Sequence, residues 1–103
     1  HFADIGRHFG GFDLAFMENG QYDRRWPDNH MFPGQTVQAA IDVGARRMMP
    51  IHWGAFSLAM HDWDEPVHRS IPLAIERGLP VLTPLIGQVF EADTETELWW
   101  KEV

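Results

Sequence analysis

Cysteine is absent from the 103-residue chain, and this absence sets the first limits on its chemistry. Without Cys there is no disulfide framework, no thiolate ligand for a metal ion and no thiol nucleophile. The chain also has no Gly-x-Ser-x-Gly nucleophile elbow and no glycine-rich phosphate loop. The common nucleophilic and nucleotide-binding mechanisms are therefore not indicated.

Positive charge is scarce as well. The chain has 8 Lys and Arg residues against 15 Asp and Glu residues, which gives a formal net charge of −7. Binding to nucleic acid needs basic side chains that replace the counterions of phosphate, and binding to anionic membranes needs a basic run. We therefore expect no nucleic-acid partner. No apolar stretch reaches the roughly 20 residues that a membrane-spanning helix needs.

Hydrophobic residues are plentiful, at 45% of the sequence, with five Trp and seven Phe residues. This composition indicates a folded chain, and its length allows one domain at most. The sequence opens with His1 rather than Met, inside an expected helix. We therefore interpret the chain as a piece of a longer protein.

The first half of the chain has the pattern of an α/β protein. A helix is expected over residues 2–9 and is ended by Gly10, and an apolar strand follows over residues 12–17. After a long loop, Pro33 opens a helix that ends at Gly44 and buries Ile41 among other residues. A second apolar strand covers residues 48–51, which completes a βαβ unit.

The second half is less regular. A helix is expected from the N-cap Asp64 to Arg77, with Ile75 on its inner face and Pro72 as a kink or break. Strands are expected over residues 79–85 and 88–92. Three apolar side chains of the preceding loop are expected to pack inward: Phe56, Leu58 and Met60. We expect Trp99 and Trp100 to dock onto the absent half of the domain or onto another subunit. The alternative is that they anchor at a membrane interface.

His52 is the first candidate for a functional residue. It follows the apolar run 48–51 directly, and ligands of open α/β sheets bind beyond the carboxyl ends of the strands. Imidazole is a good ligand for zinc and similar ions. The alternative is a core histidine whose ring is hydrogen-bonded to a backbone carbonyl.

Residues 50–56, Pro-Ile-His-Trp-Gly-Ala-Phe, resemble the last metal-ligand segment of the metallo-β-lactamase-fold hydrolases. The branch most similar contains the N-acyl-phosphatidylethanolamine-hydrolysing phospholipase D and its bacterial zinc-hydrolase relatives. The resemblance extends, in order, over further segments: residues 11–15, residues 20–26, His30, residues 39–45, residues 65–66 and residues 78–79.

The resemblance implies that residues 1–103 are the C-terminal half of an αββα sandwich with βαβ units and a mixed sheet. It implies two metal ions, expected to be zinc, with His52 binding one of them. The His-x-His-x-Asp-His motif of the family, its further His and its bridging Asp are missing from the sequence. The partner of this chain is then the N-terminal half of its own domain, and the chain alone is expected to be inactive.

The resemblance also implies a reaction and further site residues. The reaction is hydrolysis of a phosphoester or related bond, with a small molecule or a phospholipid as substrate and a metal-activated water as nucleophile. His30 is the expected catalytic residue, and Tyr22 and Trp26 are expected to line the substrate pocket. The alternatives are a solvent-exposed loop histidine for His30 and a structural flap packed by Trp26 for the loop 18–32.

A second hypothesis needs no catalysis. Half of a sandwich exposes a sheet face that is normally covered, and large apolar patches associate with partners. The chain is then a self-association module that forms a homo-oligomer.

Overall fold

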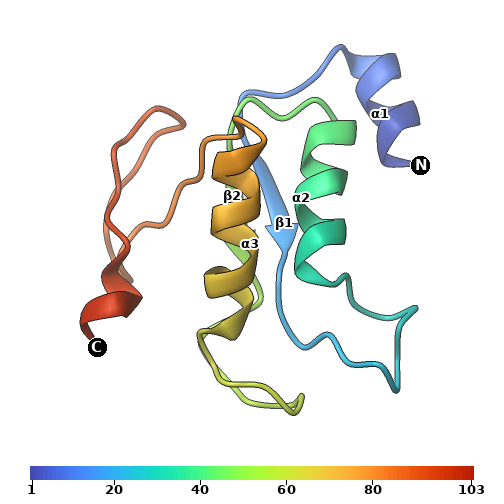
Figure 1. Ribbon diagram of the computed structural model, residues 1–103. Coiled ribbons are helices and arrows are strands. Elements are labelled where there is room, and N and C mark those ends of the chain that lie inside the picture. Colours follow the sequence, from blue (N-terminus) through green and yellow to red (C-terminus); the bar gives the residue numbers. More distant parts are fainter.

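The computed structural model describes residues 1–103 and has the α/β architecture that the sequence predicts (Figure 1). The elements follow one another in this order: α1 (Phe2–Phe9), β1 (Ala15–Glu18), α2 (Pro33–Asp42), β2 (Met48–Ile51), α3 (Glu65–Glu76) and a 3-10 helix (Trp99–Glu102). None of these helices combines the length and the apolar composition that crossing a membrane requires.

The two strands form a parallel sheet around which the rest of the chain packs. Ala15 pairs with Met48, and the register continues to Glu18 opposite Ile51. The β1–α2–β2 unit is therefore confirmed. The first strand begins later than expected, because Phe12 makes only a single parallel bridge to Ala45.

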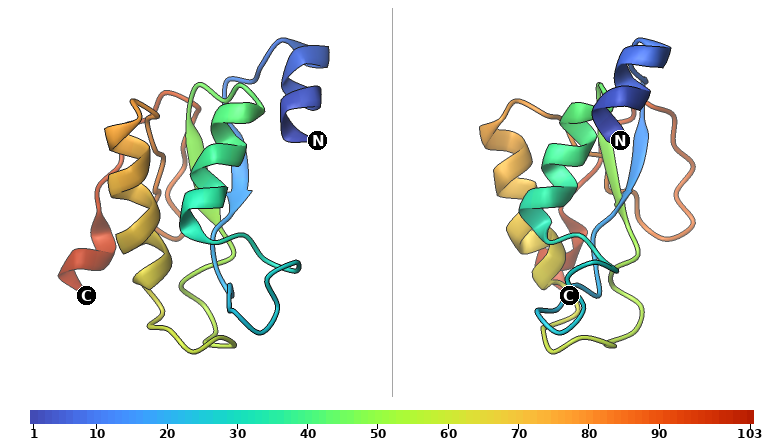
Figure 2. Two further views of the ribbon diagram at one scale, coloured as in Figure 1. Left: turned by 45° about the vertical axis from the view of Figure 1, so that its right-hand side comes forward. Right: turned by 90° about the vertical axis from the view of Figure 1, so that its right-hand side faces the viewer.

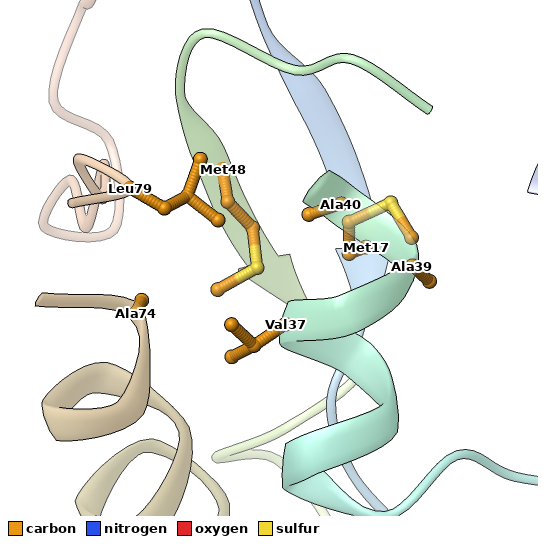
Figure 3. Packing of buried hydrophobic residues seen from close by; sticks show 7 residues of the cluster. All are labelled: Met17, Val37, Ala39, Ala40, Met48, Ala74 and Leu79. Atoms are coloured by element: carbon orange, nitrogen blue, oxygen red, sulfur yellow. The ribbon is translucent and has the colours of Figure 1, made fainter. Parts of the chain in front are cut away.

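Helices α2 and α3 lie on one side of the two strands, and α1 lies next to α2 (Figure 2). The core between them and the sheet has seven buried members (Figure 3): Met17, Val37, Ala39, Ala40, Met48, Ala74 and Leu79. Successive side chains of a strand point to opposite faces, so Met17 and Met48 face the helices. Burial of this face accounts for the position of α2 across the sheet.

The opposite face of the sheet is apolar too, but it is largely uncovered. Phe16 is 57% exposed and Ile51 is 37% exposed, and Met49 lies opposite Phe16 in the register. Parallel strands with apolar residues on both faces are typical of sheets that are buried on both sides. This chain covers the second face only in part, where Thr83 and Pro84 line a shallow pocket together with Met49.

The strands expected over residues 79–85 and 88–92 do not form, and this prediction was wrong. Val81 makes one parallel bridge to Met48, and pairing goes no further. Pro80 and Pro84 flank this bridge and lack the N–H group that a ladder needs. Instead, the Arg47 guanidinium donates hydrogen bonds to the carbonyl oxygens of Val81, Ala92 and Thr94, and so holds the tail beside the sheet. All pairings in the chain are parallel, so the antiparallel part of the expected mixed sheet stays a prediction for a larger domain.

Several side chains lie on the outside where the pattern placed them inside. Phe56, Leu58 and Met60 are 79%, 71% and 85% exposed, so the prediction that they pack inward was wrong. Ile41 and Ile75 are exposed as well, because each lies at the edge of its helical stripe. Pro72 does not split α3, which runs without a break.

The tryptophans of the C-terminal segment pack within the chain itself, which corrects the expected docking onto the absent half of the domain or onto another subunit. Trp100 is 2% exposed and lies against Val67 and Ile71. The ring centroid of Trp53 lies 5.5 Å from that of Trp99 and 5.4 Å from that of Trp100. The C-terminal segment is thereby packed against the residue that follows His52.

Candidate functional site

The candidate site lies at the carboxyl ends of β1 and β2. His52 is the first residue after β2 and has a positive φ of 66°, which is uncommon for a residue other than Gly. Gly20 lies so close to the backbone of His52 that a side chain at position 20 would overlap the His52 carbonyl oxygen. Backbone strain of this kind clusters at functional sites, and here it turns the chain sharply at the end of the sheet.

His30 lies next to His52 although the two residues are 22 positions apart in the sequence. Their ring centroids are 5.1 Å apart, with the ring planes inclined by 30°. Nδ1 of His30 lies 3.3 Å from Oε2 of Glu18, the last residue of β1. The other oxygen of that carboxylate accepts a hydrogen bond from the backbone N–H of Met31. The fold thus brings together the two histidines that the sequence singled out.

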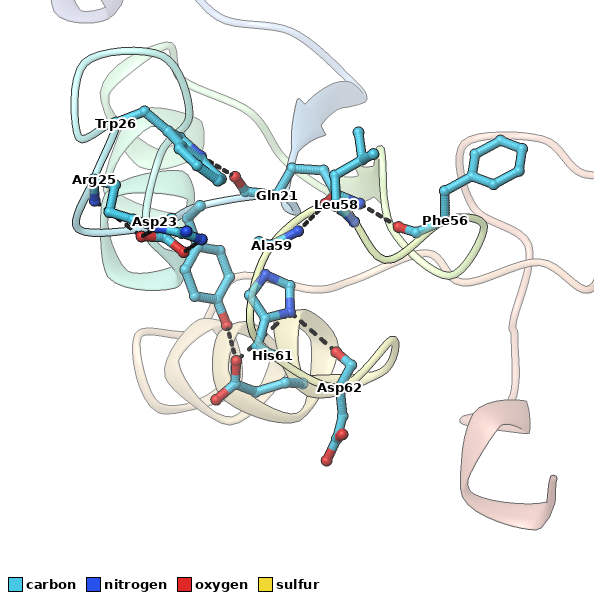
Figure 4. Close-up of polar contacts among 11 residues, drawn as sticks. Gln21, Asp23, Arg25, Trp26, Phe56, Leu58, Ala59, His61 and Asp62 are labelled. Carbon is cyan, nitrogen blue, oxygen red and sulfur yellow. Dashed lines mark hydrogen bonds and ion pairs between the residues drawn. The ribbon is translucent and has the colours of Figure 1, made fainter.

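The residues after β1 hold the loop that follows β2 (Figure 4). The buried Gln21 side chain donates to the carbonyl oxygen of Phe56 at 2.6 Å, and its own oxygen accepts from the N–H groups of Leu58 and Ala59 at 3.0 and 3.1 Å. Asn19, fully buried, donates to the Ser70 hydroxyl on α3 at 2.9 Å. The exits of both strands are therefore fixed to each other and to α3.

Tyr22 is buried, with only 4% of its surface exposed. Its hydroxyl donates to a carboxylate oxygen of Glu65 at 2.7 Å, and its ring stacks on His61 with centroids 4.3 Å apart. Burial, followed by the hydrogen bond and the negative charge of Glu65, raises the pKa of Tyr22 far above its usual value. In this chain Tyr22 ties the loop 19–32 to α3, and its contact with a substrate stays a prediction.

Trp26 is half-buried at the outer end of the same loop. Its indole N–H donates to the carbonyl oxygen of Gln21 at 2.6 Å, and the Arg25 guanidinium lies 4.6 Å from its ring centroid. The side chain of Arg25 also binds Asp23 through two oxygens. These contacts order the loop, and the expected place of Trp26 in the substrate pocket stays a prediction.

The donors of this chain do not make a metal site by themselves. No group of three or more His, Asp or Glu side chains is arranged to hold an ion. His52 and His30 offer two imidazoles, while the Glu18 carboxylate already contacts His30 and Met31. A catalytic zinc site needs at least three protein ligands, so these residues fit one corner of a site and no more.

Reasoning from the sequence missed Glu18 and Gln21. A signal was present, because the polar Glu18 ends strand β1 and the polar Asn19 and Gln21 follow it. Polar side chains at the carboxyl end of a strand in an α/β sheet often belong to the ligand site.

Comparison with known proteins agrees with this geometry. The beta-lactamase superfamily domain matches residues 1–53, just over half of the chain. An uncharacterized protein of Mycobacterium tuberculosis is 40% identical over 105 residues, which cover 97% of this chain and 28% of that protein. The chain thus spans little more than a quarter of that relative.

Two further relatives have more specific names. The outer membrane protein RomA of Klebsiella pneumoniae is 56% identical over 54 residues, or 52% of this chain and 41% of that protein. An N-acyl-phosphatidylethanolamine-hydrolyzing phospholipase D of Caenorhabditis elegans is 34% identical over 64 residues, or 60% of this chain and 18% of the enzyme. The resemblance seen in the sequence is confirmed, and the chain belongs to the beta-lactamase superfamily.

Proposed function

We propose that this chain is the C-terminal part of a metal-dependent hydrolase and that His52 binds one of its metal ions. The observation that carries the proposal is the meeting of His52 with His30 at the carboxyl ends of two parallel strands. Nitrogen donors held at strand ends suit zinc, and we expect two zinc ions in the complete domain. Bound metal ions of this kind activate water and stabilise negative charge on the reacting group.

The substrate class follows from the relatives. One of them is named for the hydrolysis of N-acyl-phosphatidylethanolamine, a phospholipid. We propose that the protein hydrolyses a phosphoester or related bond, in a small molecule or a phospholipid. His30 would act on the reacting group next to His52, while Tyr22 and Trp26 would shape the pocket from the loop 19–32.

In this proposal the chain is part of a longer protein, which supplies the remaining ligands. Residues 1–103 alone provide no complete set of donors, so we expect them to be inactive. The uncovered sheet face, with Phe16, Met49 and Ile51, supports an N-terminal half-domain as the partner that packs there. The chain would then be the C-terminal half of an αββα sandwich.

The same uncovered face supports a second function, in which the chain self-associates without catalysis. The two proposals, a half-domain partner and self-association, are distinguished by the variant Phe16→Asp. Ile75→Asp is the control, because Ile75 is exposed on α3. If a half-domain covers this face, Phe16→Asp destabilises the longer protein by about 3 kcal/mol or more, because a charge replaces a buried ring. If two copies pair through it, the variant dissociates the oligomer and leaves the monomer folded.

Hydrolysis is tested with bis(p-nitrophenyl) phosphate as the probe and the longer protein as the enzyme. We expect His52→Ala to abolish measurable turnover. His68→Ala is the matched control, because His68 lies on α3 and is paired with Asp64 at 2.9 Å. Full turnover in folded His52→Ala would overturn the assignment, whatever the effect of His68→Ala.

A further inference from the structure

Glu18 contacts two parts of the loop that carries His30. One carboxylate oxygen accepts a hydrogen bond from the backbone N–H of Met31, and the other lies 3.3 Å from Nδ1 of His30. The backbone carbonyl of Glu18 accepts a hydrogen bond from the Thr36 hydroxyl at 2.8 Å. The last residue of β1 thus fixes the end of this loop and the start of α2.

The contact with Glu18 favours one position for the proton of a neutral His30 ring. An ionised carboxylate can only accept a hydrogen bond, so a hydrogen bond between these two groups requires Nδ1 of His30 as the donor. In a neutral imidazole the second nitrogen is then an acceptor. Nε2 of His30 makes no hydrogen bond within the chain, and the ring lies beside His52.

We propose that Glu18 is a positioning residue that holds His30 in the Nδ1–H form and leaves its Nε2 as a hydrogen-bond acceptor beside His52. The proposal deepens the proposed function and rests on it for the place of His30 in the site. His30 then receives a proton or a hydrogen bond from a water or hydroxyl group of the reaction. It does not serve as a neutral N–H donor to an anionic substrate.

The tautomer of His30 can be measured without any activity. Long-range ¹H–¹⁵N correlation spectra of the longer protein, labelled at its histidines, distinguish Nδ1–H from Nε2–H rings under alkaline conditions, where free imidazole is neutral. The His30→Gln variant identifies the signals of His30. We expect the Nδ1–H form in the native protein, and a native Nε2–H form or an even mixture would overturn the proposal.

Glu18→Gln sharpens the test because it keeps the shape of the side chain. The amide oxygen can still accept from Met31, while the amide NH₂ can only donate to Nδ1 of His30. The tautomer should therefore switch to Nε2–H. Asp13→Asn is the matched control, since Asp13 is exposed and meets only Arg46, at 3.5 Å. An unchanged tautomer in folded Glu18→Gln would contradict the proposal.

Turnover of bis(p-nitrophenyl) phosphate adds a second readout. Carboxylate partners of metal-ligating histidines are typically worth about 10- to 100-fold. We take the same range for His30 and expect a loss of kcat of about 10- to 100-fold for Glu18→Gln, with KM changed less than about threefold. A native protein without hydrolase activity would refute the proposed function, while the tautomer measurement would still decide the role of Glu18. A rise in KM with unchanged kcat would show that Glu18 acts on binding and would overturn its role in orienting His30.

Discussion

Gly20 packs directly against the backbone of His52, so the segment that follows β1 contacts the first residue after β2. This contact joins two segments that lie more than thirty positions apart in the sequence. It leaves no room for a side chain at position 20. It also holds the backbone of His52, whose φ is 66°, in place. The geometry of the proposed metal ligand therefore depends on a glycine.

Replacing Gly20 with Ala should displace His52. The added methyl group meets backbone atoms, which cannot rotate away, and overpacking of this kind costs about 1–3 kcal/mol. We expect a lower free energy of unfolding in denaturant titrations, and slower hydrolysis by the folded variant. Gly34→Ala is the control, because no atom lies near that position in α2 and Ala favours a helix. Equal stability of the two variants would contradict the close packing at Gly20.

Tyr22 is the only tyrosine among the 103 residues, so its ionisation can be followed by absorbance in this chain. Its pKa is raised in the folded state by burial and by the Glu65 carboxylate. A raised folded-state pKa means that the contribution of Tyr22 to stability is complete below the unfolded pKa of about 10 and is lost as the pH rises through the folded value. Tyrosinate absorbance should therefore appear only as the protein unfolds at alkaline pH.

The Tyr22→Phe variant tests the hydrogen bond itself. Loss of the hydroxyl removes a bond to a carboxylate that is partly exposed, so we expect a destabilisation of about 1 kcal/mol near neutral pH. The alkaline loss of stability should also become smaller in this variant. A native protein whose Tyr22 titrates at its ordinary pKa while folded would refute the buried contact with Glu65.

Gln21 should control the order of the loop after β2. Gln21→Ala leaves the N–H groups of Leu58 and Ala59 without their acceptor, at a cost of about 1–3 kcal/mol. Amide hydrogen exchange at these two residues should accelerate, and the exposed Gln38→Ala on α2 should leave it unchanged. Unaltered exchange at both amides in Gln21→Ala would show that other contacts hold the loop.

Local sequence patterns predicted the regular elements well and the site only in part. Residues 48–51 form the expected strand because a short apolar run that follows a helix and a short link is typical of a buried parallel strand. The end of α1 at Gly10 was predicted from a local signal as well. Gly10 adopts the left-handed conformation, with a φ of 77°, that a glycine C-cap requires. His52 was predicted from its position directly after a strand, and His30 from the resemblance to a family. Both predictions used the residues next to them in the sequence.

The failures have a common cause in contacts between distant residues. Phe56 and Leu58 are apolar and were expected inside, yet the Gln21 side chain binds the backbone of their loop and leaves their rings and methyl groups outside. The Glu18–His30 contact joins a strand end to a loop with no periodicity, so no spacing rule indicates it. The segment in which strands were expected is held instead by hydrogen bonds from the Arg47 side chain to backbone carbonyl groups. Composition and periodicity give no sign of these bonds.

The metal content of the longer protein tests the central claim most directly. Elemental analysis of protein purified without a His tag should find about two equivalents of zinc in the native protein, as in two-metal hydrolases, and a loss of at least one of them in His52→Ala. His68→Ala should keep the native content, because its ring is paired with Asp64 on α3. Native metal content in folded His52→Ala would contradict the assignment of His52 as a ligand.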